Sequence, residues 1–191
     1  PYDLVTSRDS LEEIKRWCEM NSIPFRKLIY VSPSIPKTVL NYEIFIDDNP
    51  NMANHMDNGK ILLLYDRPWN RKVGETENIK RVFNFEEINA RISEYKFKDL
   101  IEVAREEGVA MLFKEGEVYA DRNVLKILNC KDGRDAIALA ITSENENPFP
   151  LCEGCRRYLW KKTNPDLVII SANENEVRKS KRLSQIYPYP Y

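Results

Sequence analysis

The first half of the chain alternates short apolar runs with polar connections. The run 4–6 reads as the end of a buried strand, and a helix is expected after it, opened by a capping box of Ser10 and Glu13. The apolar face of that helix is Leu11, Ile14, Trp17 and Cys18. Further strands are expected at 28–31, 42–46 and 61–65. Strands that alternate with helical or loop crossovers predict an α/β fold with a parallel, doubly wound sheet.

The carboxyl ends of these strands carry polar residues. In open parallel sheets, ligands bind outside the carboxyl ends of the strands, where Thr6, Asp47 and Asp66 are expected. The adjacent Asp47 and Asp48 close an apolar run, and carboxylate oxygens suit a magnesium ion that also binds substrate phosphate. The pair therefore indicates magnesium and phosphoryl chemistry. The alternative is that Asp48 or Asn49 only caps the helix that follows.

The second half has a different order of elements. Its charged first stretch, 87–98, is expected to be mostly helical. The elements expected after it are a helix with its apolar face at 100–104, a hairpin of 109–113 and 117–119 around Lys114-Glu115-Gly116, a helix at 123–128, a strand at 136–141, a helix at 152–161 and a last strand at 167–170. We therefore expect two domains, at residues 1–94 and 95–191.

Composition excludes several classes of protein. No apolar stretch approaches the roughly 20 residues that span a membrane, and the formal net charge of -1 gives no overall attraction to nucleic acid. A basic cluster with nearby aromatics could track a phosphate backbone, but such runs are usually solvated faces, so a nucleic-acid partner is not expected. This cluster is Arg178, Lys179, Lys181 and Arg182, with Tyr187, Tyr189 and Tyr191. The three tryptophans, Trp17, Trp69 and Trp160, fit core or pocket-wall positions.

The cysteine and histidine counts narrow the chemistry further. Four unevenly spaced cysteines do not make a disulfide framework in 191 residues, which favours the reducing cytosol and a cytoplasmic location. His55 is the only histidine, so mechanisms that need a histidine base have almost nothing to use. The chain opens on Pro1 without an initiator methionine, and we expect it to be cut from something longer.

Several motifs of residues 1–93 together resemble the later portion of a haloacid-dehalogenase-type phosphatase, and most of all the 5'(3')-deoxyribonucleotidase group. In order, they are Val5-Thr6-Ser7-Arg8, Lys37, Phe45-Ile46-Asp47-Asp48, Tyr65-Asp66-Arg67-Pro68-Trp69-Asn70-Arg71 and Arg81-Val82-Phe83-Asn84-Phe85. The resemblance implies a partial Rossmann-like parallel sheet and a nucleoside monophosphate as substrate.

The resemblance also assigns roles to single residues. Thr6 would donate to the transferring phosphoryl group, and Lys37 would neutralise charge on its oxygens, both of which are electrostatic roles. Asp47 and Asp48 would hold or position magnesium, and Arg67 and Trp69 would line the substrate site. The family's nucleophile and general acid come from an Asp-x-Asp, and this sequence contains none. Either that strand is supplied by an upstream segment or a partner chain, or catalysis has been lost.

Residues 99–191 resemble the cytidine deaminase family. Cys152 and Cys155 have a spacing that lets two thiols reach one zinc ion from the first turn of a helix. A strand at 136–141 precedes them, a strand at 166–170 follows, and the chain ends Leu183-Ser184-Gln185-Ile186-Tyr187-Pro188-Tyr189-Pro190-Tyr191. The resemblance implies a smaller α/β domain that commonly assembles as oligomers, and therefore a homo-oligomer as one expectation.

The zinc-site residues of that family are altered here. In the family, a histidine or cysteine supplies a third zinc ligand and a glutamate moves protons. Tyr119 and Asp121 stand at these positions, so the domain reads as degenerate and deaminase activity is not expected. Cys130 is an alternative third sulfur. The thiol pair has two interpretations. Cys152 and Cys155 either bind zinc, or they are small, partly buried residues that bind no metal.

Two functional hypotheses follow. The first is a magnesium-dependent nucleoside monophosphate phosphatase that is catalytic only with an Asp-x-Asp segment. Both resemblances point to a pyrimidine nucleotide as its substrate. The second is a non-catalytic module of two degenerate enzyme domains that senses a nucleotide or packs into an assembly. Turnover separates them, because a sensor binds nucleotide without hydrolysing it.

Overall fold

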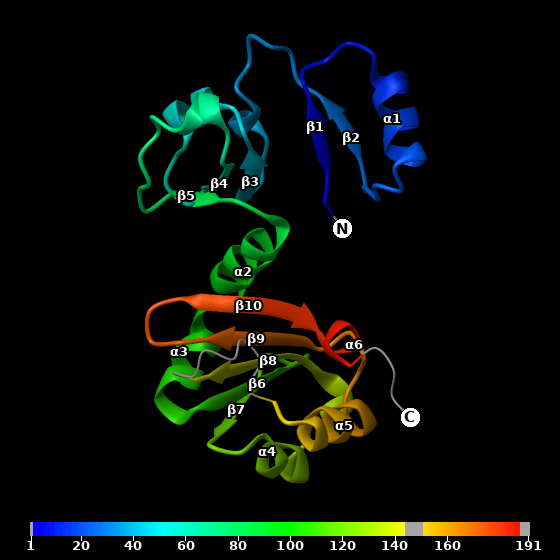
Figure 1. Cartoon of the computed structure of the whole chain (residues 1–191), viewed down its shortest axis with the longest axis vertical. Coiled ribbons are helices and arrows are strands. Elements are labelled where there is room, and N and C mark those ends of the chain that lie inside the picture. The colour runs from blue at the N-terminus through cyan, green and yellow to red at the C-terminus, as the bar shows by residue number, and fades with distance from the viewer. Residues whose placement is uncertain (1, 144–150, 188–191) are drawn as a thin grey trace. The chain divides into compact units, whose positions relative to one another are not determined.

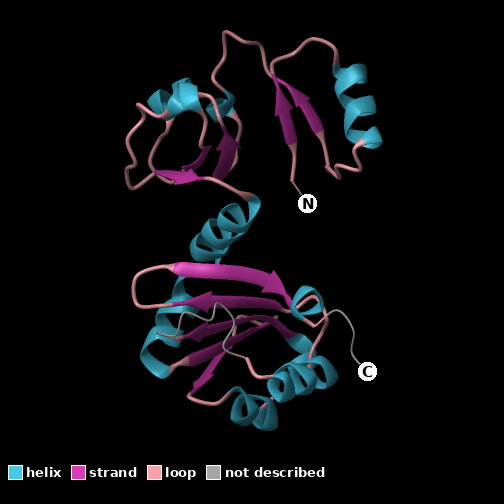
Figure 2. Cartoon of the chain, viewed as in Figure 1, coloured by secondary structure: helices cyan, strands magenta, loops and turns pink. Residues whose placement is uncertain are grey.

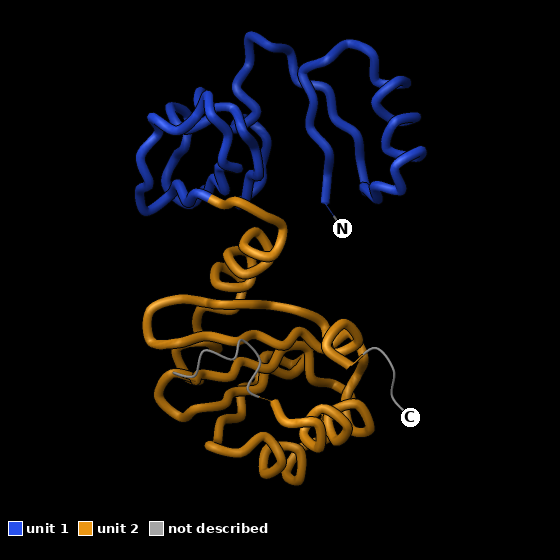
Figure 3. Tube along the Cα trace, in the orientation of Figure 1, with its two compact units in different colours: residues 1–81 blue, residues 82–191 orange. Residues whose placement is uncertain are grey.

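The computed structural model describes residues 2–143 and 151–187 (Figure 1). They form a mixed α/β structure that divides into two compact units, Pro1–Arg81 and Val82–Tyr191 (Figure 3). Tyr189 and Tyr191 of the predicted aromatic tail lie outside the described residues. Within the described part of the chain, no helix is long and apolar enough to cross a lipid bilayer.

Unit 1 contains two small sheets instead of the single sheet that the pattern predicts. Strand β1 (Leu4–Thr6) runs parallel to β2 (Leu28–Tyr30), and α1 (Leu11–Met20) connects them. The second sheet has the order β3 (Ile44–Asp47), β4 (Ile61–Tyr65) and β5 (Ile79–Val82), with β3 and β4 parallel. The strands at β1 to β4 were predicted, but the apolar pattern does not specify which strands pair.

Helix α1 differs from its prediction in two respects. Ser10 Oγ donates to Glu13 Oε2 at 2.9 Å, but it accepts no backbone hydrogen bond, so only part of the expected capping box forms. Cys18 is buried, whereas Trp17 is 58% exposed and takes no core position. The core of unit 1 lies instead under the second sheet, where Phe45, Leu62, Leu64, Ile79 and Met52 pack together.

Unit 2 is built on a five-stranded mixed sheet with the order β10-β9-β8-β6-β7 (Figure 2). Its strands are β6 (Val109–Phe113), β7 (Val118–Asp121), β8 (Ala136–Thr142), β9 (Val168–Ala172) and β10 (Val177–Arg182). Its helices are α2 (Phe85–Lys96), α3 (Lys98–Glu107), α4 (Val124–Cys130), α5 (Glu153–Lys162) and α6 (Leu183–Ile186). Only β8 and β9 are parallel, and α5 lies between them in the chain. The predicted hairpin β6-β7 is confirmed, with Gly116 at φ 82° in its turn.

The two faces of this sheet have side chains of different size. Large residues on one face, including Met111, Phe113, Leu139 and Ile169, pack with α4, α5 and α6, and we call this cluster the large-residue core. On the other face Ala110, Ala138 and Ala140 pack with residues of α2 and α3. Successive residues of a strand point to opposite faces, so one strand serves both clusters. The small side chains let α2 and α3 approach the sheet closely.

Strand β10 was not predicted, and it changes the boundary between the two parts of the chain. Its sequence, VRKSKR, carries charges where a strand usually carries apolar residues. Glu86 of α2 pairs with Lys179 and Lys181 at 3.4 and 3.2 Å, and Ser93 Oγ lies 2.7 Å from Ser180 Oγ. Part of the basic cluster is therefore occupied within unit 2. Because α2 packs on β10, the units divide between Arg81 and Val82, upstream of the expected boundary at 94 and 95.

Candidate functional site

The carboxylate of Asp47, the last residue of β3, is held from two directions. Lys37 Nζ donates to its Oδ2 at 2.7 Å, and the backbone N–H of Asn49 donates to its Oδ1 at 2.9 Å. The side chains of Lys37 and Asp47 are 22% and 13% exposed, so solvent screens this pair less than an ordinary surface pair. Lys37 lies in the connection from β2 to β3, and the pair thus fixes that connection to the end of β3.

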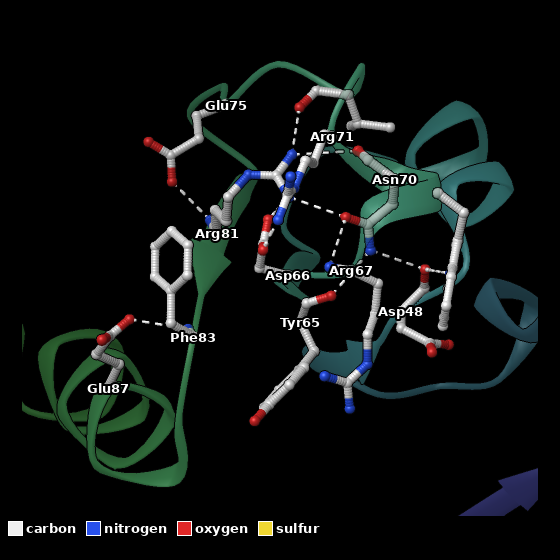
Figure 4. Close-up of polar contacts among 12 residues, drawn as sticks. Asp48, Tyr65, Asp66, Arg67, Asn70, Arg71, Glu75, Arg81, Phe83 and Glu87 are labelled. Atoms are coloured by element: carbon white, nitrogen blue, oxygen red, sulfur yellow. Dashed lines mark hydrogen bonds and ion pairs between the residues drawn. The ribbon is translucent and has the colours of Figure 1, made fainter.

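Asp48 differs from its neighbour because its carboxylate makes no hydrogen bond or ion pair with any residue that the structure describes. The residue is half-buried, and its backbone carbonyl accepts from Asn70 Nδ2 at 2.9 Å and from Trp69 Nε1 at 3.2 Å (Figure 4). Asn49, not Asp48, caps the 3₁₀ turn that follows, by accepting from Asn51 N at 3.0 Å. The main chain of Asp48 is therefore anchored while its carboxylate stays available to a ligand.

Asn70 connects the ends of β3 and β4 from a fully buried position. Its Nδ2 donates to the carbonyls of Asp48 and Tyr65, and its Oδ1 accepts from Arg67 N at 3.2 Å and from Arg81 Nη1 at 2.9 Å. Both ends of the amide are satisfied, as burial requires. The sequence analysis assigned no role to Asn70, although it lies in a quoted motif. Its position two residues after a proline, next to a strand end, was the available signal.

Arg81 of β5 supports the same loop. It donates to Asp66 Oδ1 at 2.8 Å, to Asn70 Oδ1, and to the carbonyl of Val73 at 2.7 Å (Figure 4). The Arg81 side chain is 15% exposed, so these charge-assisted contacts are largely shielded from water. The strand pattern predicted Asp66 as a ligand-binding residue, but its carboxylate forms an internal ion pair with Arg81.

The remaining predicted residues of unit 1 are placed differently. Thr6 ends β1, and its Oγ1 accepts from Arg8 N at 3.1 Å; no hydrogen bond of the described residues joins it to Lys37 or Asp47. Arg67 stacks on the ring of Tyr65, with its Cζ 4.5 Å from the ring centroid. Trp69 is 62% exposed beside Asp48, and so lies at a surface and not in a core.

The two predicted thiols of unit 2 do lie together. Cys152 caps the N-terminus of α5, where its Sγ accepts from the backbone N–H of Cys155 at 3.2 Å, and the two sulfurs are 2.8 Å apart. The hydrogen bond between the two thiols, with help from backbone N–H groups, lowers the pKa of Cys152. The same contact, with burial second, raises the pKa of Cys155. One thiol of the pair is thereby favoured as the thiolate.

Tyr119 and Asp121 make their contacts elsewhere. The Tyr119 ring packs edge-on against Phe113, with centroids 5.5 Å apart, and Lys131 Nζ lies 5.4 Å from its centroid. Asp121 accepts from Asn123 N at 3.0 Å and pairs with Lys126 at 3.5 Å. Across residues 2–143 and 151–187, no group of three or more His, Cys, Asp or Glu side chains is arranged to hold a metal ion.

Comparisons with known proteins give structural likenesses but no sequence match. No protein-family model matches the sequence, and no curated protein does. Among solved structures, a cytidine deaminase from Burkholderia pseudomallei is similar, with a TM-score of 0.43 and 21% identity over 49% of this chain and 98% of that chain. A likeness at this level assigns neither a family nor an activity. The phosphatase resemblance of residues 1–93 rests on sequence motifs alone.

Proposed function

We propose that the carboxyl end of β3 binds the phosphate of a nucleoside monophosphate together with magnesium. The observation that carries this proposal is the Asp48 carboxylate, which has no partner in the described part of the chain and lies next to the Lys37–Asp47 pair. A half-buried carboxylate without a partner is costly to desolvate, and a bound cation offsets that cost. The preference for a pyrimidine nucleotide is taken from the two sequence resemblances.

The donor set suits magnesium in particular. Magnesium usually keeps several waters and is bound by one or two carboxylates plus substrate phosphate, so a cluster of three acids is not required. Asp48 is the proposed ligand, because both Asp47 oxygens already accept hydrogen bonds. When bound, the ion would neutralise charge on the phosphate oxygens.

The other residues act on the phosphate and on each other. Lys37 Nζ, which Asp47 holds, is proposed to attract a phosphate oxygen, and the Thr6 hydroxyl is proposed to donate to a second one. Asn70 keeps the main chain of Asp48 in place. Hydrolysis would require an aspartate nucleophile from an Asp-x-Asp, which this sequence does not contain. We therefore propose binding as the property of this chain, and turnover only where another segment or chain supplies the nucleophile.

Calorimetric titration of the chain with dUMP tests the proposal. Binding should require magnesium, and Asp48→Asn should weaken it about tenfold or more, which corresponds to about 1.4 kcal/mol. Asp57→Asn is the matched control, because Asp57 is an exposed acid of the same unit that forms an ion pair with Lys60 at 3.6 Å. Equal affinity in the presence and absence of magnesium, or equal loss in both variants, would refute the site.

A phosphate-release assay on the same samples separates the two functional hypotheses. A nucleotide sensor binds dUMP without releasing phosphate, and a purely structural assembly module does not bind it. The lack of an Asp-x-Asp in the sequence favours binding without release for the chain by itself. Magnesium-dependent release that is lost in Asp48→Asn would instead establish a phosphatase.

A further inference from the structure

The Cys152–Cys155 pair has features that neither nucleotide binding nor a degenerate deaminase site explains. Cys152 is exposed at the N-cap of α5, and Cys155 is partly buried, packed against the large-residue core. Helix α5 is the crossover between the parallel strands β8 and β9. An exposed thiol and a shielded thiol thus share the first turn of a helix that the sheet holds in place.

The distance between the sulfurs allows a covalent bond. They lie 2.8 Å apart, and a disulfide is about 2.05 Å long, so closing the bond needs an approach of less than about 1 Å. The Cys155 N–H that donates to Cys152 Sγ, together with the positive end of the helix dipole, stabilises negative charge on that sulfur. The stabilised negative charge favours Cys152 as the attacking thiolate. The short distance between the sulfurs favours Cys155 as the thiol that resolves the mixed disulfide.

We propose that Cys152 and Cys155 form a redox-active dithiol that exchanges with low-molecular-weight disulfides. The Cys152 thiolate attacks one sulfur of the small disulfide, forms a mixed disulfide and releases one thiolate. Cys155, after losing its proton, attacks Cys152 Sγ and releases the second thiolate, which leaves a Cys152–Cys155 disulfide. The protein loses two electrons and two protons, and the small disulfide gains them as two thiols.

The other two cysteines provide internal references. Cys18 is buried in α1, and Cys130 is exposed at the end of α4, and both are free thiols. Exposure alone would make Cys130 as reactive as Cys152. The proposal instead assigns exchange to the pair, so that Cys130→Ser is the matched control for substitutions at the site.

The test equilibrates the reduced 191-residue chain with mixtures of reduced and oxidised glutathione. After acid quenching and alkylation, mass spectrometry locates each disulfide. Wild type and Cys130→Ser should both form the Cys152–Cys155 disulfide. Cys155→Ser should hold one glutathione on Cys152, and Cys152→Ser should lose the internal disulfide completely. Circular dichroism checks that each variant is folded. The detection of the Cys152–Cys155 disulfide in wild type does not depend on whether the variants fold.

Two results would overturn the proposal. In the first, wild type forms no internal disulfide, or glutathione modifies Cys130 to the same extent as Cys152. In the second, elemental analysis finds one equivalent of zinc per chain that Cys152→Ser abolishes, which would make the thiols metal ligands. The dUMP titration does not involve these residues, so failure of either proposal leaves the other standing.

Discussion

The Asp3 carboxylate, just before β1, accepts three hydrogen bonds that tie distant parts of unit 1 together. Arg26 donates to it from Nε at 2.8 Å and from Nη2 at 2.7 Å, and the Tyr42 hydroxyl donates as well. The hydrogen bond from Arg26, followed by that from Tyr42, holds the pKa of Asp3 well below its ordinary value of 3.8. Tyr42 lies just before β3, so this one carboxylate links the two sheets.

These contacts predict a pH dependence. Because the pKa of Asp3 is lower in the folded chain, its contribution to stability is present above the unfolded value near 3.8 and is lost as pH falls toward the folded value. Removing one donor by Tyr42→Phe should raise the pKa of Asp3 toward 3.8. A carboxyl-carbon NMR titration measures the shift. Asp132, whose pKa Arg134 lowers to about 2, is the internal reference and should not move. An unchanged Asp3 titration would contradict the prediction.

At the scale of elements, the contact between the α4–β8 connection and the end of α5 depends on a glycine. Gly133 is buried, and a Cβ added to it would lie 2.6 Å from Leu128 Cδ2 and 2.7 Å from the carbonyl oxygen of Lys162. The carbonyl is main chain and cannot rotate away. Only hydrogen at this position lets the connection pack so closely on α5.

Gly133→Ala should therefore destabilise unit 2. The expected loss of unfolding free energy is roughly 1–3 kcal/mol, the usual effect of overpacking a close contact. Urea denaturation followed by circular dichroism measures it. Gly74→Ala is the control, because a Cβ there meets no atom within 4 Å, and its effect should stay within roughly 0.5 kcal/mol. Equal effects of the two substitutions would contradict the close approach.

At the scale of the whole molecule, helix α2 decides where one unit ends and the next begins. Ile88 and Ala90 of α2 are buried, and Ala90 belongs to the cluster on the small-residue face of the unit 2 sheet. Glu86 and Ser93 contact β10. Both apolar and polar contacts of the helix thus assign it to unit 2.

Two fragments test this assignment. A fragment of residues 82–191 keeps α2, whereas a fragment of residues 95–191 removes most of it and exposes the face on which Ala90 packs. The shorter fragment should unfold at lower urea concentration, because removing most of α2 exposes apolar side chains of the cluster that Ala90 joins, and buried apolar surface stabilises by roughly 25 cal/mol per Å². Equal midpoints would show that α2 contributes nothing to unit 2 and would support the boundary at 94 and 95.

The sequence by itself determined most of the local elements. Strands such as 61–65 and 136–142 and the turn at Gly116 were predictable, because apolar periodicity and turn chemistry depend on near neighbours. Strand β10 was not predicted because its sequence is charged. Lys179 and Lys181 are accommodated by ion pairs with Glu86 of α2, which the local sequence does not reveal. Strand pairing in unit 1 also depends on contacts between residues far apart in the chain, so runs of apolar residues could not predict it.

The candidate sites divide in the same way. The strand-end pattern predicted Asp47 and Asp48, because carboxylate oxygens suit magnesium, whereas Lys37 was predicted only from the phosphatase resemblance. Only the tertiary structure distinguished Asp47, whose oxygens accept hydrogen bonds, from Asp48, whose carboxylate has no partner among the described residues. Only the structure revealed Asn70, which joins the main chain of Asp48 to the end of β4. Hydrogen bonds between residues far apart in the chain decide which side chains are available, and spacing in the sequence does not record them.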